Sequence, residues 1–505
     1  MAQLAFVIDQ GRCIGCHACT VACKVEHGVE LGVFRTWVKY IERGEFPDAS
    51  RHFAVLRCNH CTDAPCVEVC PVTSLYKRED GIVDFDPERC IGCKACMNAC
   101  PYDALYIDPN SHTAAKCNFC AHRVELDLKP SCEVVCPVGA IISGDIDDPG
   151  SEVSRLLGAA PSAVRSPEQG TGPNVHYLAA DPAALDPLAA AGGKAYLTTE
   201  VPRSQREKLL PLNGEAPAIA TADVEHPPPW GWRVSSYFLS KGVAAGAMML
   251  AAPLLVLGAR GSALADIVPG VLALAGIAVT GVFLVSDLKQ PRRFYYLFTK
   301  PQWRSWLTLG AHALGVAAAA AFVFTLAAIF GWHGLRDVMR WVLIPAGALL
   351  AGYTAMLFNQ CEGRDLWQSP LLLPHTIINA LVAGAGGLGI GAIFVSAPTT
   401  TVRALGWTLV LGVAASAGVI ALDTFGRHPT RQAERAARNL YRDRFAKRFW
   451  IGGVLLGVAA PAALGIAFLA AGGDGLLAAG GACALAGLWF YEDAWVRAGQ
   501  SVPLS

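Results

Sequence analysis

Sixteen of the 18 cysteines lie in four regularly spaced groups within the first 136 residues. The groups are Cys13-x2-Cys16-x2-Cys19-x3-Cys23, Cys58-x2-Cys61-x4-Cys66-x3-Cys70, Cys90-x2-Cys93-x2-Cys96-x3-Cys100 and Cys117-x2-Cys120-x11-Cys132-x3-Cys136. Three closely spaced thiolates on one loop reach three iron corners of a cube, and the fourth, carried off by a turn, reaches a neighbouring cube. Sixteen thiolates with this spacing predict four [4Fe-4S] clusters.

Two other uses of these cysteines fit the spacing less well. Structural zinc is held by paired C-x2-C elements, but it does not require a third cysteine three residues further on. Disulfides need an oxidising compartment. The first residues contain neither an apolar run of signal-peptide length nor a twin-arginine pair, so we expect the thiols to stay in a reducing compartment. Both alternatives are therefore disfavoured.

Five ionisable or phenolic residues lie in or at apolar stretches of the second half. Lys241, Tyr353 and His375 can donate hydrogen bonds to the carbonyls of a quinone, and Asp287 and Asp423 can relay protons. Polar residues inside a membrane are costly and mark functional sites. We expect these five residues to form a quinone site, for menaquinone or ubiquinone, and its proton relay.

Each of these residues also has a structural explanation. Lys241 could extend to the membrane interface, and His375 could cap its helix. Asp423 could pair with Arg427, and Asp287 could anchor the following loop.

No haem is expected, because a b-type haem between spans usually takes two axial histidines. His312 and His375 lie in or at the spans at different depths, and His312 is interpreted as an interhelical polar group. Cys361 and Cys483 are interpreted as small apolar residues. A haem-free anchor places the quinone site close to the last cluster, on the head side of the bilayer.

The composition indicates which elements hold these residues. The 505-residue chain is 53% apolar and only 16% charged, against about 25% charged in an average soluble protein. Eight apolar stretches, each near the roughly 20 residues that span a bilayer, follow residue 234. They lie at 235–258, 265–286, 305–330, 341–358, 374–396, 405–424, 449–471 and 475–492.

Three parts follow. Residues 1–148 are predicted to form an α+β, double-ferredoxin-like iron–sulfur head of short strands and turns. Residues 149–234, rich in Pro, Gly and Ala, are expected to be a largely irregular connector. Residues 235–505 are predicted to form an all-α bundle of eight transmembrane helices.

The distribution of charge predicts the orientation. Formal net charge is zero, which argues against a nucleic-acid partner. Loops on the head side carry 15 Lys and Arg residues, and the far side carries four: Arg260, Arg336, Arg340 and Arg403. The positive-inside rule therefore predicts a head on the cytoplasmic side of a bacterial or archaeal inner membrane, with the periplasmic side as the alternative.

The cysteine-rich half resembles the four-cluster electron-transfer subunit of complex iron–sulfur molybdoenzymes. The resemblance implies four ligand sets. The first set is Cys13, Cys16, Cys19 and Cys136; the second is Cys23, Cys117, Cys120 and Cys132; the third is Cys58, Cys61, Cys66 and Cys100; the fourth is Cys70, Cys90, Cys93 and Cys96. It also implies that the first set is nearest a catalytic partner and the fourth nearest the membrane. Some relatives have Trp at the position of Cys93 and hold a three-iron cluster, so Cys93 implies a complete cube.

The apolar half resembles the polysulfide-reductase-type (NrfD-like) membrane subunit. The resemblance is carried by Ser286-Asp287-Leu288-Lys289-Gln290-Pro291-Arg292-Arg293, by Gly352-Tyr353-Thr354 and by Gly363-Arg364-Asp365-Leu366-Trp367. In most relatives the two halves are separate polypeptides, so their fusion is a departure from the family pattern.

The sequence has no molybdopterin domain, P-loop or dinucleotide fingerprint, so substrate conversion is assigned to a partner chain. The resemblance implies an electron-transfer and quinone-reactive anchor subunit that serves a molybdenum- or tungsten-pterin catalytic subunit. A nickel–iron hydrogenase or a multihaem cytochrome c is the alternative partner. A transporter with a zinc-binding regulatory head is a further alternative. The partner's substrate and the direction of electron flow stay open.

Overall fold

The computed structural model describes residues 2–44, 47–191, 218–256 and 262–505. The chain divides into two compact units. The first comprises Met1–Pro229 with Cys361–Gly363 and Pro503–Ser505, and the second comprises Trp230–Gln360 with Arg364–Val502. The first is an α+β head and the second is all helical, which confirms the predicted fold class.

The head contains a four-stranded sheet built around its first strand. Strand β1 (Leu4–Asp9) pairs in parallel with β10 (Val175–Leu178) and antiparallel with β8 (Ile141–Asp145), and β9 (Ser162–Ala163) pairs with β10. Residues 5–8 of β1 are fully buried because both faces of the strand are covered. Continuous apolar runs such as Ala-Phe-Val-Ile are typical of strands covered on both sides.

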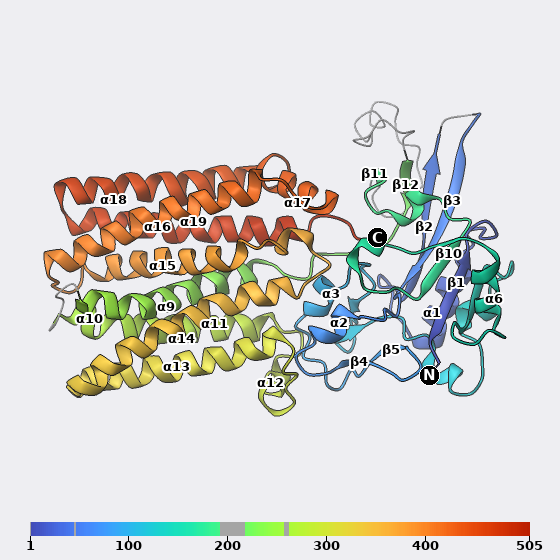
Figure 1. Ribbon diagram of the computed structural model, residues 1–505, viewed down its shortest axis with the longest axis horizontal. Helices are drawn as coiled ribbons and strands as arrows, with labels where there is room; N and C mark the ends of the chain where they lie inside the picture. The colour runs from blue at the N-terminus through green and yellow to red at the C-terminus, as the bar shows by residue number, and fades with distance from the viewer. Residues whose placement is uncertain (1, 45–46, 192–217, 257–261) are drawn as a thin grey trace. The chain divides into compact units, whose positions relative to one another are not determined.

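A second sheet contains the long hairpin of β2 (Thr36–Arg43) and β3 (Ser50–Arg57), which is visible in Figure 1. Strand β12 (Ala218–Ala222) pairs with β2, and β11 (Ala190–Ala191) pairs with β12. Two small hairpins complete the strands: β4 (Leu75–Lys77) with β5 (Val83–Phe85), and β6 (Tyr106–Ile107) with β7 (Ala114–Ala115). The head helices are α1 (Ala18–His27), α2 (Pro65–Glu68), α3 (Ala95–Ala99), α4 (Ala121–Val124), α5 (Ser131–Val134), α6 (Glu152–Ala159) and α7 (Pro182–Leu185).

The expected connector is more ordered than its composition indicates. Its described residues supply helices α6 and α7 and strands β9 to β12, so both sheets of the head depend on it. The four-residue strand β10 is too short to show a period, and it is stable only because β1 lies beside it. The interpretation of 149–234 as largely irregular was therefore wrong for these residues, and 192–217 lie outside the described part.

Eight helices in the described part of the second unit are long and apolar enough to cross a membrane. They are α9 (Trp232–Val256), α11 (Val268–Asp287), α13 (Trp306–Ile329), α14 (His333–Asn359), α15 (Leu372–Gly391), α16 (Thr399–Phe425), the continuous helix Arg448–Ala471, and α19 (Asp474–Gly499). Helix Arg448–Ala471 begins as a π-helix (η5, Arg448–Ala459) and continues as α18 (Ala460–Ala471). Shorter helices α10 (Ala263–Asp266), α12 (Tyr296–Thr299) and α17 (Arg431–Tyr441) lie between spans.

Helix α14 begins eight residues before the expected span, and the earlier start places two arginines inside the helix. Arg336 and Arg340, predicted to lie in a far-side loop, are buried within α14. Arg336 pairs with Asp266 of α10 at 3.1 Å, and Arg340 pairs with Asp266 and with Asp337. The ion pairs allow the helix to carry arginines into an apolar bundle.

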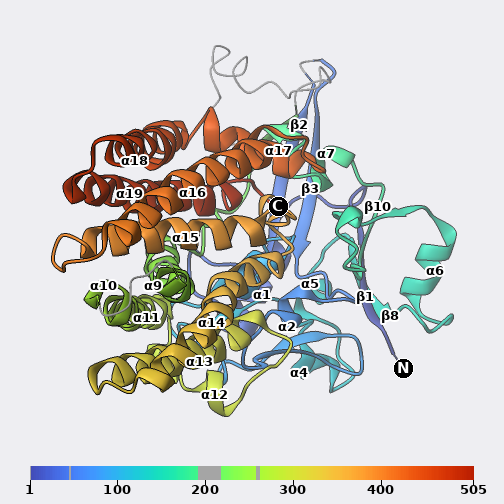
Figure 2. The same ribbon diagram turned by 60° about the vertical axis from the view of Figure 1, so that its left-hand side comes forward.

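The bundle has two cores that share helices α9 and α15. One core joins α9 with α11, α13 and α14, and the other joins α15 with α16, α18 and α19. Figure 2 shows α9 next to α11, with α14 and α15 close by. Helix α9 therefore contacts both halves of the bundle.

Helices α9 and α15 approach closely through glycines. A methyl group on Gly246 would lie 1.8 Å from the carbonyl oxygen of Ala380, and one on Gly384 would lie 2.3 Å from the carbonyl carbon of Gly246. Small residues let transmembrane helices pack backbone to backbone, where van der Waals contact replaces the hydrophobic effect.

We predict that Gly246→Ala destabilises the bundle by about 1–3 kcal/mol, because the added methyl group forces α9 and α15 apart. Gly281→Ala in α11 is the matched control, since no atom lies within 4 Å of its new methyl group. The measurement is the thermal unfolding midpoint of detergent-purified protein. Equal midpoints for the two variants would contradict the packing argument.

Candidate functional site

The first and third cysteine loops have the same backbone conformation. Gly15 and Gly92 have φ of 68° and 69°, and His17 and Lys94, each just after the second cysteine, have φ of 61° and 64°. Helices α1 and α3 begin immediately after these residues. Left-handed residues alternating with right-handed ones turn successive N–H groups into one concavity, a geometry found at iron–sulfur sites.

The thiols of the first and second sets lie together in the groups that the resemblance implies. Burial raises the pKa of Cys13, and the thiolates of Cys136 and Cys16 raise it further. Burial also raises the pKa of Cys120 to about 12, with the thiolates of Cys117 and Cys132 contributing. The fourth cysteine of the first motif, Cys23, lies beside Cys117, Cys132 and Cys120 rather than within its own loop's set.

The third and fourth sets are likewise assembled from two motifs each. Burial raises the pKa of Cys61 to about 12, and the thiolates of Cys58 and Cys100 add to the shift. Cys58, Cys61, Cys66 and Cys100 together line one pocket. Burial raises the pKa of Cys93 to about 12, with Cys70 and Cys90 as its charged neighbours.

Neighbouring sets are linked by close thiols. The thiols of three pairs lie close enough to interact electrostatically: Cys19 with Cys132, Cys117 with Cys58, and Cys96 with Cys66. These three links place the sets in one row, in the order first, second, third, fourth. Within the described residues, no three His, Cys, Asp or Glu side chains converge on a point as they would around a single metal ion.

Hydrogen-bond donors point at several of the sulfurs. Backbone N–H groups of Ser74 and Ala140 each lie 3.2 Å from the Sγ atoms of Cys70 and Cys136, respectively. Such bonds stabilise negative charge on sulfur and influence cluster potentials. The concave loops, paired thiol sets and inward N–H groups fit [4Fe-4S] clusters held by these sixteen cysteines.

Two buried cations near the thiols were not anticipated from the sequence. Arg57 is 1% exposed, and its Nη1 donates to Cys132 Sγ at 3.1 Å. Burial would lower the pKa of Arg57, but the thiolates of Cys132, Cys117 and Cys19 raise it overall. Lys116 is fully buried and donates to the carbonyl oxygens of Val83 and Cys117. In the sequence, Arg57 directly precedes Cys58 and Lys116 directly precedes Cys117, and this position could have identified both cations.

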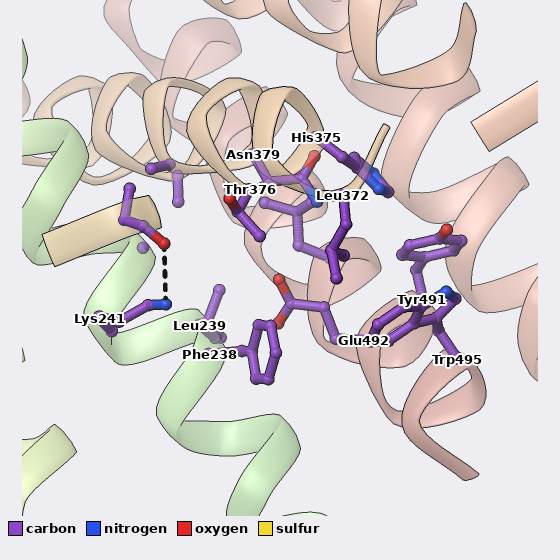
Figure 3. A pocket seen from close by; sticks show the side chains of 15 residues that line it. Phe238, Leu239, Lys241, Leu372, His375, Thr376, Asn379, Tyr491, Glu492 and Trp495 are labelled. Carbon is purple, nitrogen blue, oxygen red and sulfur yellow. Dashed lines mark hydrogen bonds between the residues drawn. The ribbon is translucent and has the colours of Figure 1, made fainter. Parts of the chain in front are cut away.

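The membrane unit contains a partly enclosed cavity among α9, α14, α15 and α19, with about 510 Å³ of space not filled by protein, part of which is open to solvent (Figure 3). Its walls are mostly apolar. The polar side chains that line it are Lys241, His375, Thr376, Asn379, Tyr491, Glu492 and Trp495. It lies where α9 and α15 begin and α14 and α19 end, which is the end of the bundle that the chain enters from the head.

Lys241 is held at the wall of this cavity by neighbours on α14. Its Nζ donates to the carbonyl oxygen of Ala351 at 3.2 Å and to Thr354 Oγ1, and it lies 4.9 Å from the ring centre of Tyr353. The residue is 2% exposed, so its charge lies inside the bundle rather than at the interface. The alternative that Lys241 extends to the interface does not match this position.

Several polar atoms around the cavity have no hydrogen-bond partner in the described part of the chain. They are His375 Nε2, Tyr491 OH, Glu492 Oε2 and Trp495 Nε1. Buried polar atoms are nearly always paired in native proteins. Four unpaired atoms around one cavity are therefore suited to a polar ligand.

The other candidates from the sequence lie elsewhere. Tyr353 packs against Gly310 of α13 and meets Lys241 through its ring, without lining the cavity. Asp287 ends α11, away from the cavity lining. Asp423 accepts a hydrogen bond from Ser369 and lies within electrostatic range of His428 and Tyr491. His312 contacts Thr308 of its own helix, 2.9 Å from Nδ1 to the carbonyl oxygen, and its ring packs against Phe298 of α12.

Sequence reasoning missed Tyr491, Glu492 and Trp495. The last apolar stretch was expected to end at 492, whereas α19 continues to Gly499. Glu492 could have been identified as a carboxylate within a membrane span, because ionisable residues inside spans mark functional sites.

Curated relatives match about a third of the chain. A tetrathionate reductase subunit of Salmonella typhimurium is 45% identical over 190 residues, covering 37% of this chain and 76% of that protein. The arsenate respiratory reductase iron-sulfur subunit ArrB of a Shewanella species is 34% identical, covering 35% and 96%. A sulfite dehydrogenase subunit of Allochromatium vinosum is 40% identical, covering 35% and 83%.

Family models match both halves of the chain. A 4Fe-4S binding domain matches residues 10–26, a 4Fe-4S dicluster domain matches 50–146, and the polysulphide reductase NrfD family matches 222–500. The last match covers more than half of the 505 residues. The chain therefore belongs to the polysulphide reductase NrfD family and carries a 4Fe-4S iron–sulfur domain on the same polypeptide.

Proposed function

We propose that this chain is the electron-transfer and quinone-reactive anchor of a membrane-bound oxidoreductase complex. It would connect a molybdenum- or tungsten-pterin catalytic subunit with the quinone pool of the membrane. The observation that carries the proposal is the polar cavity in a bundle whose chain also holds a row of four thiol sets. When bound, [4Fe-4S] clusters supply one-electron redox centres.

The residues of the head have two roles in this function. Sixteen cysteines would hold the clusters in the four sets named above, and Arg57 and Lys116 would balance negative charge where the sets meet. Cys16 is the exposed cysteine of the first set, and exposed apolar residues Ile14, Val21 and Val135 lie near its ligands in the sequence. An exposed apolar surface beside the first set suits the docking of a partner subunit.

The catalytic partner is inferred from the relatives. Tetrathionate reductase, a putative dimethyl sulfoxide reductase, arsenate respiratory reductase and sulfite dehydrogenase are among the enzymes whose subunits resemble this chain. These four names describe redox chemistry on oxidised compounds of sulfur or arsenic. We infer a partner that acts on a substrate of this kind.

In the membrane unit, Lys241 and His375 would donate hydrogen bonds to the quinone carbonyls from different walls of the cavity. Tyr353 would fix the Lys241 ammonium through its ring. The apolar walls would exclude water and hold the rest of the ring.

We predict about sixteen iron atoms per chain, four for each of four clusters. Cys93→Ser should remove or convert only the fourth cluster, with the loss of up to about four iron atoms, and should stop quinone-linked turnover. Iron analysis and electron paramagnetic resonance of anaerobically purified protein measure both. Cys483→Ser, in α19, should keep the full iron content, and four zinc atoms without iron in the unmutated chain would overturn the proposal.

We predict that Lys241→Ala and His375→Phe each lower quinone-linked turnover, by about 100-fold where a hydrogen bond to the reacting carbonyl is lost, and that Tyr353→Ala lowers it by removing the ring that holds Lys241. Iron content and partner-linked reduction of a soluble dye should persist, because these residues lie in the bundle. Lys447→Ala, an exposed change outside the cavity, is the control. Quinone kinetics that match the unmutated protein in all three variants would contradict the site.

We predict that the head faces the cytoplasm, because the head-side loops carry most of the Lys and Arg residues. Eight spans place Ser505 on the side of the head. A green fluorescent protein fused after Ser505 should therefore fluoresce, and alkaline phosphatase fused there should be inactive. The reverse pattern would place the head on the periplasmic side.

A further inference from the structure

Glu492 is a carboxylate in the membrane cavity that the proposed function has not yet used. It is 8% exposed, lines the cavity from α19, and its Oε2 has no hydrogen-bond partner in the described chain. Figure 3 shows its carboxylate between Lys241 on one side and Tyr491 on the other. A buried acid that is free of hydrogen bonds can exchange a proton with a ligand in the cavity.

The surroundings explain how Glu492 can remain in an apolar bundle without being fixed there. Lys241 is the cation within electrostatic range of its carboxylate, and no ion pair joins the two among the residues that the structure describes. The ammonium donates instead to Ala351 and Thr354. Lys241 therefore offsets the charge of the carboxylate and leaves its oxygen available.

Neighbouring groups continue from Glu492 toward the end of the bundle. Tyr491 is the adjacent residue on α19, and both Glu492 and Asp423 of α16 lie within electrostatic range of it. Asp423 in turn meets Ser369 and His428, two half-buried residues outside the spans. In the described part of the chain, the titratable groups that line the cavity with Glu492 are Lys241 from α9, His375 from α15 and Tyr491 from its own helix, and Asp423 of α16 lies within electrostatic range of Tyr491.

We propose that Glu492 is the residue that exchanges protons with the bound quinone, and that Tyr491 and Asp423 connect it with water at the head-side end of the bundle. The inference rests on the proposed quinone function. Oxidation of one quinol releases two electrons and two protons. The electrons would go to the iron–sulfur clusters that the sixteen cysteines would hold, and the protons pass one at a time to the carboxylate of Glu492. From Glu492 each proton leaves toward water past Tyr491 and Asp423, which lie within electrostatic range of each other.

The test uses the full-length, cluster-loaded protein and a short-chain naphthoquinol. Stopped-flow absorbance follows quinol-driven reduction of the iron–sulfur head, and equilibrium binding is measured with the oxidised quinone. We expect Glu492→Gln to keep quinone affinity within about twofold and to slow the saturated rate about 100-fold or more, the usual size of a lost general acid or base. The rise in rate with pH, which in the unmutated protein follows deprotonation of Glu492, should also disappear.

Three variants sharpen the test. Glu492→Asp retains a carboxylate and should recover at least a tenth of the rate, while Asp423→Asn should slow the rate without changing quinone affinity. Glu434→Gln in α17, an exposed glutamate paired with Arg438, should match the unmutated protein.

Two results would overturn the inference. One is a Glu492→Gln protein with an unchanged rate and pH profile; the other is weaker quinone affinity with an unchanged saturated rate, which indicates positioning alone. If the Gln variant does not assemble, an unchanged rate in Asp423→Asn overturns the proposed proton route instead. If the unmutated protein binds no quinone, the proposed function itself is contradicted. If the unmutated protein binds quinone and the Glu492→Gln variant turns over at the normal rate, only the role of Glu492 is contradicted.

Discussion

Burial of thiols is the constraint on which the head is built. Thiolates in an apolar interior are unfavourable, which is why burial raises the pKa of the cysteines in all four sets. The structure offsets this cost with inward N–H groups and two fully buried cations, Arg57 and Lys116. Strand β3 ends in Arg57 and therefore delivers this charge to the junction of the first and second sets. The iron that the cysteines would bind supplies the remaining positive charge.

The membrane bundle also has to accommodate buried polar groups. Helices α9 and α15 pack through Gly246 and Gly384, so their backbones touch along one stretch. Toward the end of the bundle, larger polar side chains replace the glycines and the helices enclose a cavity. Lys241 and Glu492 both line that cavity, whereas Arg340 and Asp266 elsewhere in the bundle are directly paired. A direct pair favours stability, and a separated pair leaves both groups available to a ligand.

The two units divide the proposed chemistry between electrons and protons. The thiol row of the head is suited to one-electron carriers, and the cavity of the bundle is suited to a molecule that takes up two electrons together with two protons. Fusion of the two parts in one chain fixes their ratio at one to one. In this arrangement the proton route proposed through Glu492, Tyr491 and Asp423 is independent of the cluster ligands, so mutations can separate the two functions.

The sequence by itself determined the elements whose signal is local. Cysteine spacing predicted the iron–sulfur head, and the length of the apolar stretches predicted the eight spans, because both signals depend only on residues that are close in the sequence. Lys241 and His375 were found for the same reason, as polar residues inside apolar runs. Only the tertiary structure decided that the 149–191 segment completes the head's sheets, since a four-residue strand such as β10 is stable only beside β1. It also decided that Glu492, Tyr491 and Trp495 face Lys241 across a cavity while Tyr353 does not line it, because the direction of a side chain between helices depends on which neighbours pack against it.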